Sequence, residues 1–351
     1  TVGSRGRRTA LSVLLGSAMA MLLTVTSAGA AAAKPDAGGT GAAAPASTDV
    51  WMKDNAADTG HEPSTGTIYW SPDIKVCNGP IECATHQNPI GGTTNYVFVT
   101  LRRPGPKDRQ GRAEGRLLLY RTAAGGGTAW PSSWVYIGSA YVPDVPYGTL
   151  TVRIPWVDVP DYGHFCLLAR WVSDSDPMTY AEGPVTTLNT SNNNNIAWRN
   201  VDIIPVQPGE GPVRVPFVAE NALDVPTPNG IHFTQLNQLP FDRVGGQVVV
   251  DLGETLFERW RGGGLAGTNV RYVGGTQVQI LDPAKASLDN IELRPKERLT
   301  FHLLFSARVK AEEQFQVNVA LWGPASPNDR IPIDLGGVLY VLDVSGRGDG
   351  R

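Results

Sequence analysis

The residues best suited to chemistry lie close together in the stretch DYGHFCLLARW, residues 161–171, where His164 precedes Cys166 by two positions. An imidazole can act as a base or a metal ligand, and a thiol becomes reactive when its pKa is lowered. The strand that holds them is apolar on both faces, which is typical of a strand buried on both sides. We therefore predict that Cys166 is an inert core thiol, with a bridge to Cys77 or Cys83 as the alternative.

His164 stands where immunoglobulin-like domains often carry a tyrosine, two residues before the strand cysteine. That tyrosine ties the corner to upstream backbone, and an imidazole can supply the same hydrogen bond. No other histidine or carboxylate lies at motif spacing from it. We interpret His164 as a structural tie, and a role as ligand or base as the alternative.

Two pairs of aspartates could hold calcium, which prefers clustered carboxylate and carbonyl oxygens. Asp54 and Asp58 lie in a polar lead-in, and Asp174 and Asp176 follow the apolar strand. The first pair does not match the spacing of an EF-hand loop, and the second is typical of turns that aspartate side chains cap. Calcium stays open as a cofactor, and no other cofactor is expected.

Trp130 and Trp134, in the sequence WPSSW, allow two interpretations. They could form an exposed aromatic platform for a sugar or a peptide. Packing at one end of a sandwich is the commoner fate of such rings, and we favour it.

Composition and missing motifs limit the function further. The net charge is −3, so the chain has no basic footprint for nucleic acid. The sequences HExxH and GxSxG are absent, and no phosphate-binding glycine loop follows a strand. We therefore predict a protein that is not an enzyme.

The first thirty residues have the pattern of a signal peptide, with Arg5, Arg7 and Arg8 before an apolar run and a small-x-small site at 28–30. Residues 31–48 are rich in Ala, Gly and Pro, which predicts a disordered spacer. Removal of residues 1–30 would leave no transmembrane segment. Export permits disulfides, and we predict a local bridge between Cys77 and Cys83 across an Asn-Gly-Pro turn.

Short apolar runs separated by Gly, Pro and Asn predict an all-β protein of two immunoglobulin-like sandwiches in tandem. The first domain spans 49–206. Its seven expected strands are 67–76, 95–101, 116–121, 134–137, 150–156, 165–171 and 198–204.

The second domain spans 209–345, and residues 346–351 form a flexible tail. Its eight expected strands are 213–218, 230–233, 247–252, 270–272, 276–281, 299–305, 314–321 and 337–344. One short helix near 254–261 would place Leu256, Phe257 and Trp260 on one face before the glycine run stops it.

Four stretches carry a resemblance to a known module: SPDIKV at 71–76, HQNPIGGTTNYVFV at 86–99, WPSSW at 130–134 and GHFCLLAR at 163–170. Together they resemble the CARDB-like, cell-adhesion-related immunoglobulin-like modules of secreted bacterial proteins, over residues 49–206. The resemblance implies a β-sandwich and leaves the ligand open, since such modules often accompany catalytic domains. The insert with Cys77 and Cys83 departs from the pattern.

These observations favour a secreted, non-catalytic binding or structural protein that acts in adhesion or ligand presentation outside the cell. Its partner would be an extracellular protein or a carbohydrate. The alternative is a secreted hydrolase, or an accessory subunit of one, with a site between the two sandwiches.

Overall fold

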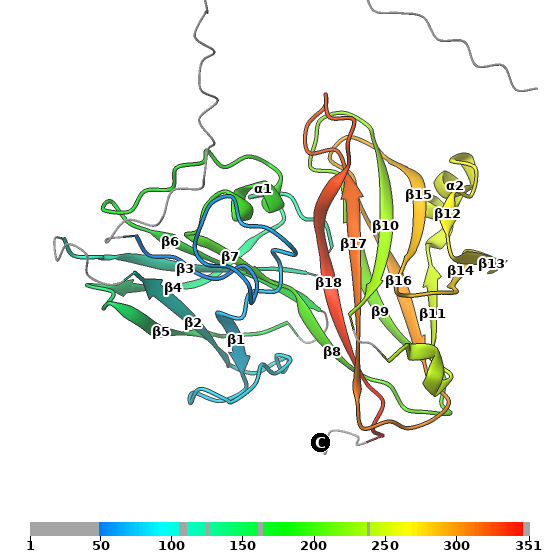
Figure 1. Cartoon of the computed structure of the whole chain (residues 1–351), viewed down its shortest axis with the longest axis horizontal. Helices are drawn as coiled ribbons and strands as arrows, with labels where there is room; N and C mark the ends of the chain where they lie inside the picture. The colour runs from blue at the N-terminus through cyan, green and yellow to red at the C-terminus, as the bar shows by residue number, and fades with distance from the viewer. Residues whose placement is uncertain (1–48, 105–110, 124–125, 161–163, 237–238, 347–351) are drawn as a thin grey trace, which may run out of the picture. The chain divides into compact units, whose positions relative to one another are not determined.

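The computed structural model describes residues 49–104, 111–123, 126–160, 164–236 and 239–346. The predicted signal peptide, the spacer, the corner at 161–163 and nearly all of the tail lie outside these residues and stay predictions. Within them the regular secondary structure is almost entirely β-strand, as the sequence predicts, and forms two pairs of facing sheets (Figure 1).

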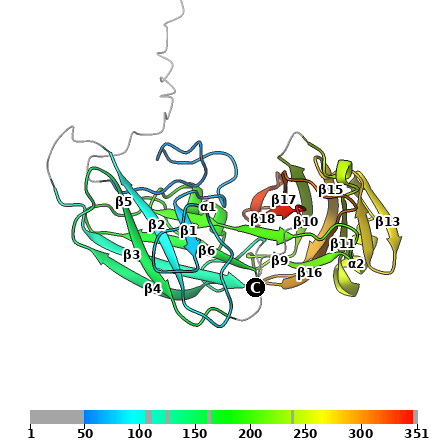
Figure 2. The ribbon, with the colours of Figure 1, turned by 90° about the horizontal axis from the view of Figure 1, so that it is seen from below.

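The first sandwich has seven antiparallel strands. A three-stranded sheet has the order β1-β2-β5 and a four-stranded sheet the order β4-β3-β6-β7, and Figure 2 shows the two sheets facing each other. The strands are β1 (Ile74–Cys77), β2 (Asn95–Arg103), β3 (Gly115–Ala123), β4 (Val135–Val142), β5 (Gly148–Trp156), β6 (Phe165–Val172) and β7 (Ile196–Arg199).

Alternation along the strands builds the core of this sandwich. Val97, Val99 and Leu101 on β2 are fully buried and meet Leu167 and Trp171 of β6 in one cluster. The opposite face of β6 carries Cys166 and Leu168, which belong to a second cluster with Trp134 and Trp198. The prediction that β6 is buried on both faces is therefore confirmed.

The second sandwich joins a six-stranded sheet, β12-β15-β10-β17-β18-β8, to a five-stranded sheet, β13-β14-β11-β16-β9. Its strands are β8 (Val201–Pro205), β9 (Val213–Glu220), β10 (Thr227–Gln235), β11 (Gln247–Asp251), β12 (Gly267–Thr268), β13 (Val270–Gly274), β14 (Gln277–Ile280), β15 (Ala286–Leu293), β16 (Arg298–Ser306), β17 (Gln314–Gly323) and β18 (Ile333–Asp343). Apolar side chains of both sheets form one core cluster.

The predicted short helix is α2 (Gly253–Gly262), which buries Leu256 and Trp260 against the second sandwich. Two further helical segments were not expected from the sequence. They are α1 (Thr186–Ser191) and the 3₁₀ helix η1 (Phe241–Val244). α1 is rich in Thr, Ser and Asn, which are weak helix formers, so its sequence gives no apolar helical periodicity.

The strand expected over 198–204 is two strands, β7 and β8, separated at Asn200. β7 pairs with β6, whereas β8 pairs in parallel with β18 in the other sandwich (Figure 1). Asn200 is fully buried at the break, where its backbone N–H donates to the Tyr69 carbonyl and its carbonyl accepts from Leu339. The chain thus crosses between the sheets with its backbone groups paired. The domain boundary after residue 206 stays a prediction, with β8 contributing to the second sandwich.

Candidate functional site

A buried polar network surrounds the crossing at Asn200. His164 Nδ1 lies 3.1 Å from Asp202 Oδ2, and His164 Nε2 bonds to Asn200 Oδ1. Asn200 Nδ2 in turn donates to the Gly337 carbonyl at 2.6 Å. His164 is therefore a tie, but its partners are downstream side chains and not the upstream backbone expected for a corner residue.

The electrostatics of His164 suit an imidazolium. Burial alone would lower its pKa, but the adjacent Asp202 carboxylate and the two hydrogen bonds outweigh burial and raise the pKa above its ordinary value. A protonated ring donates from both nitrogens, which matches its two acceptor partners. Asp202 also accepts from Asn88 Nδ2 at 3.1 Å, so its carboxylate is well supplied with donors.

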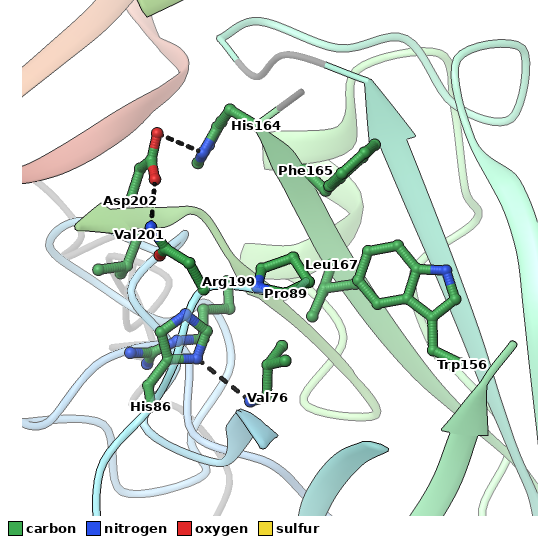
Figure 3. A pocket seen from close by; sticks show the side chains of 11 residues that line it. Val76, His86, Pro89, Trp156, His164, Phe165, Leu167, Arg199, Val201 and Asp202 are labelled. Atoms are coloured by element: carbon green, nitrogen blue, oxygen red, sulfur yellow. Dashed lines mark hydrogen bonds and ion pairs between the residues drawn. The ribbon is translucent and has the colours of Figure 1, made fainter. Parts of the chain in front are cut away.

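Next to this network lies a cavity of about 130 Å³, which we call the joint cavity (Figure 3). It is bounded by strand residues of both sheets of the first sandwich, by the loop after β1, and by the start of β8. Its lining residues are Val76, His86, Asn88, Pro89, Trp156, His164, Phe165, Leu167, Arg199, Val201 and Asp202.

Two basic side chains of the joint cavity each have one buried nitrogen with no hydrogen-bond partner among the described residues. These atoms are Arg199 Nε and His86 Nε2. His86 Nδ1 accepts the backbone N–H of Val76 at 3.2 Å, which holds the ring in place. Neither residue was singled out from the sequence, because a lone Arg or His on a strand or loop carries no motif.

The cysteines agree with the favoured interpretation. Cys77 and Cys83 form the predicted disulfide, so Cys166 has no cysteine left to pair with in a chain of three. Cys166 is fully buried, and burial raises the pKa of its thiol to about 12. A thiol that stays protonated at neutral pH is a poor nucleophile.

The tryptophan platform is not supported. Trp134 is only 7% exposed, donates from Nε1 to Thr186 Oγ1 and packs edge-on against Trp198. Trp130 is half-buried between Tyr120, which meets its ring edge-on, and Arg170, whose guanidinium lies over it. The rings pack within the first sandwich, so the weaker hypothesis of an exposed platform is wrong for Trp134.

The four aspartates do not form one calcium site. Asp58 accepts the backbone N–H groups of Asp54 and Gly60, which makes it a turn cap. Asp176 accepts from the Val50 backbone and from Asn195 Nδ2. Asp174 is exposed beside β3 and β4.

Ser64 Oγ donates to Asp54 Oδ2, whereas Asp54 Oδ1 is buried and has no hydrogen-bond partner among the described residues. Within the described ranges, no group of three or more His, Cys, Asp or Glu side chains could hold a metal ion. The hypothesis of a calcium site is therefore not supported by any such cluster in this part of the chain.

A second hollow lies on the second sandwich and was not foreseen. We call it the Trp322 pocket; it measures about 440 Å³. Its lining residues are Pro228, Asn229, Gly230, His232, Asp289, Asn290, Trp322, Pro324, Asp329, Arg330 and Pro332. A neighbouring hollow of about 430 Å³ shares His232 and Trp322, so this pair of rings has recessed surface on two sides.

The strand pattern explains how His232 reaches this surface. On β10 it stands between the buried Ile231 and Phe233, and alternation turns its ring to the opposite face of the sheet. There it stacks on Trp322, with ring centroids 5.0 Å apart and an interplanar angle of 12°. In the sequence, the only local indication of this site is a histidine that stands between two apolar residues of a strand and so faces outward.

An acid lines the polar edge of the Trp322 pocket, and a hydroxyl from the neighbouring hollow bonds to it. Asp289 Oδ1 lies 3.3 Å from His232 Nε2, and Ser287 Oγ donates to Asp289 Oδ2 at 2.7 Å. A Cβ atom at position 230 would lie 2.9 Å from His232 Nε2, so a larger residue there would have to displace the ring. Partial burial lowers the pKa of His232 despite the opposing effect of Asp289, so the ring is neutral at neutral pH.

The order of these three groups differs from that of a hydrolytic triad. In a triad the hydroxyl bonds to the imidazole, which removes its proton. Here the hydroxyl bonds to the carboxylate, and the imidazole contacts the other carboxylate oxygen. Ser287 is therefore not placed to be activated by His232, and the arrangement suits hydrogen bonding to a ligand.

The comparisons with known proteins leave the family open. No family model matches the chain, and no curated protein matches it. Among solved structures, elastase-activated alpha-2-macroglobulin of Escherichia coli aligns with 77% of this chain at 10% identity and a TM-score of 0.22. The alignment spans 22% of that protein's length.

The collagen adhesin CNA of S. aureus aligns with 77% of this chain and 91% of its own, at 8% identity and a TM-score of 0.22. Likeness at this level carries no argument about function, which must come from this chain's own residues. In the part of the chain that the structure describes, every helix falls short of the length and apolar character needed to cross a bilayer.

Proposed function

We propose that this chain is an exported, non-catalytic binding protein and that its Trp322 pocket holds an extracellular carbohydrate. The observation that carries the proposal is the stacked Trp322–His232 pair, recessed on two sides and edged by Asp289. The alpha-2-macroglobulin and adhesin likenesses contribute nothing to it.

Sugar chemistry fits this combination of groups. A pyranose ring has apolar C–H faces, which pack on flat aromatic rings, and a rim of hydroxyls that need hydrogen-bond partners. Trp322 and His232 supply the aromatic surface, while Asp289, Asn290 and Arg330 supply acceptors and donors at its edge. Mixed polar and aromatic lining of this kind is typical of sites that fix the orientation of a polar ligand.

Export is supported by two independent features. Residues 1–30 have the charge and apolar pattern of a signal peptide. The Cys77–Cys83 disulfide belongs to an oxidising compartment, since disulfides rarely persist in a reducing cytosol.

An oligosaccharide array, followed by calorimetric titration of any hit, tests the proposal. Trp322→Ala should weaken binding at least about tenfold, because it removes the aromatic face. Tyr141→Ala is the matched control: Tyr141 is an exposed ring on β4, outside the Trp322 pocket, and its loss should leave affinity unchanged. Binding that survives Trp322→Ala, or an array without any hit, would contradict the carbohydrate proposal.

The alternative of a secreted hydrolase rests on Asp289 and His232, because an acid–imidazole pair in a pocket can activate water. Release of reducing ends or of a chromogenic leaving group from glycosides and esters would measure it. Activity that disappears in His232→Gln would establish the hydrolase and overturn the non-catalytic proposal.

A further inference from the structure

Arg199 in the joint cavity is a largely buried cation that has no counter-ion among the described residues. Its Nη1 donates to the Ser71 carbonyl at 2.7 Å, and its Nε is buried without a partner. No ion pair among the described residues includes Arg199. Burial lowers its pKa to about 10, which still leaves the guanidinium charged at neutral pH. A buried charge of this kind is costly unless an opposite charge meets it.

His86 adds a second donor to the same cavity. Its Nδ1 accepts the Val76 N–H, so the proton of the neutral ring sits on Nε2, where the atom is buried and unpartnered. Burial, with the nearby charges of Arg199 and His164, holds its pKa well below the ordinary value, against a smaller opposing effect of the Val201 backbone carbonyl, which lies near the ring N–H without reaching hydrogen-bond geometry. His86 is thus a neutral N–H donor.

The charges around the joint cavity sum to about one positive unit. The imidazolium of His164 and the carboxylate of Asp202 offset each other at 3.1 Å, and His86 is neutral, which leaves Arg199. Apart from Asn88, the other walls are apolar, with Val76, Trp156 and Leu167 lining one side (Figure 3). A complementary ligand would carry one negative charge and a short apolar body.

We propose that the joint cavity binds a short-chain monocarboxylate, with the carboxylate on Arg199 Nε and His86 Nε2 and the alkyl part against Trp156 and Leu167. The size agrees, because 130 Å³ is close to the roughly 150 Å³ of a protein cavity that holds benzene. Such a ligand has about six non-hydrogen atoms, as butyrate does. This site is separate from the Trp322 pocket and does not depend on carbohydrate binding.

Titration of the exported chain with butyrate, butyramide and inorganic phosphate tests the site by calorimetry and by thermal unfolding in carboxylate-free buffer. Butyrate should bind with a Kd on the order of 1 mM and raise Tm with concentration. Butyramide has the same shape without the charge, and should bind at least about tenfold more weakly. Phosphate binding as tight as that of butyrate would show that the cavity accepts oxyanions in general, and would overturn the proposal.

Arg199→Met keeps the length of the side chain and removes its charge, and should weaken butyrate binding about ten- to hundredfold. The variant should fold, since replacing an uncompensated buried charge by an apolar group is often stabilising. Arg271→Met, at an exposed arginine on β13, is the matched control and should bind as the unmodified chain does.

A second measurement avoids mutation. Butyrate should change the chemical shifts of the His86 imidazole in the nuclear magnetic resonance spectrum of the unmodified chain, and butyramide should not. Unchanged His86 resonances at saturating butyrate, or equal butyrate affinity in Arg199→Met, would overturn the proposal.

Discussion

The joint cavity and the Trp322 pocket use the same side-chain types in opposite ways. In the joint cavity His164 and Asp202 are nearly buried and tie the crossing between β7 and β8. In the Trp322 pocket His232 and Asp289 make a similar pair, yet each side chain is 37% exposed. A buried pair contributes to folding because water cannot replace either partner, whereas water replaces the partners of an exposed pair at little cost.

The two sites also differ in how many elements they join. The buried polar network beside the joint cavity links His164, Asn200 and Gly337, which come from both sandwiches. The Trp322 pocket is lined by residues of the second sandwich alone. We therefore expect substitutions at the first site to change stability and substitutions at the second to change binding.

Asp202→Ala should have the largest effect on stability. It leaves a buried imidazolium without its carboxylate, which costs about 3–5 kcal/mol for a buried pair. Because the folded-state pKa of His164 is raised, the contribution is complete below the unfolded pKa of about 6.5 and is lost as pH rises through the folded value. Urea unfolding at pH 6 measures the effect.

The matched control for Asp202→Ala is Asp329→Ala, an exposed carboxylate of the Trp322 pocket. It should change the free energy of unfolding by less than about 0.5 kcal/mol. An equal loss of unfolding free energy in Asp202→Ala and Asp329→Ala would contradict the division into a stabilising site and a binding site.

Asp334 gives a pH dependence of the opposite kind to that of most acids. Burial raises its pKa to about 6, against the opposing hydrogen bonds from Gly336 N–H and Tyr69 Oη. The folded chain therefore holds this proton more tightly than the unfolded chain, whose Asp pKa is about 3.9. Stability from Asp334 is complete below about pH 4 and is lost as pH rises through about 6, by at most about 3 kcal/mol.

Asp334→Asn isolates this contribution. Between pH 4.5 and pH 7.5 the unmodified chain should lose unfolding free energy through the ionisation of Asp334. The variant has no carboxyl group at this position, so it should not show this loss. An identical pH profile for the two proteins would show that Asp334 titrates normally.

The Cys77–Cys83 disulfide should have a smaller effect, because it closes a short loop. Loop-closure entropy predicts about 2 kcal/mol for a separation of six residues. The bridge lies between Val76 and His86, which both line the joint cavity. Replacing both cysteines by Ala should therefore lower Tm and weaken butyrate binding, while leaving binding at the Trp322 pocket unchanged. Carbohydrate affinity that falls by the same factor would contradict this separation.

Local patterns in the sequence predict much of the fold. Alternation in β2 and double-sided apolarity in β6 identify strands and their burial, and the spacing of Leu256 and Trp260 identifies α2. The Cys77–Cys83 bridge follows from proximity along the chain. Each of these features is decided by residues a few positions apart.

The sites depend on pairings that are distant in sequence, and the sequence does not reveal them. The break at Asn200 is set by Tyr69, His164 and Gly337, which lie up to 137 residues away. Which charges surround Arg199 is decided by residues distant in sequence, and no described acid pairs with it; Trp322 meets His232 only through the pairing of β10 with β17. Hence the strands are predictable and the two pockets are not.

His232→Gln is expected to have only a small effect on stability and gives the sharpest contrast between the two sites. The half-exposed ring loses its stack on Trp322 and its contact with Asp289, but water can solvate both groups, so unfolding should change by less than about 1 kcal/mol. His164→Gln, the same substitution at the buried site, should cost several times more, because it leaves Asp202 without its cation. Urea unfolding of the two variants side by side measures the ratio. If the His232 variant proves as unstable as the His164 variant, the Trp322 pocket is part of the structural framework, and its stacked rings are held for packing and not for a ligand.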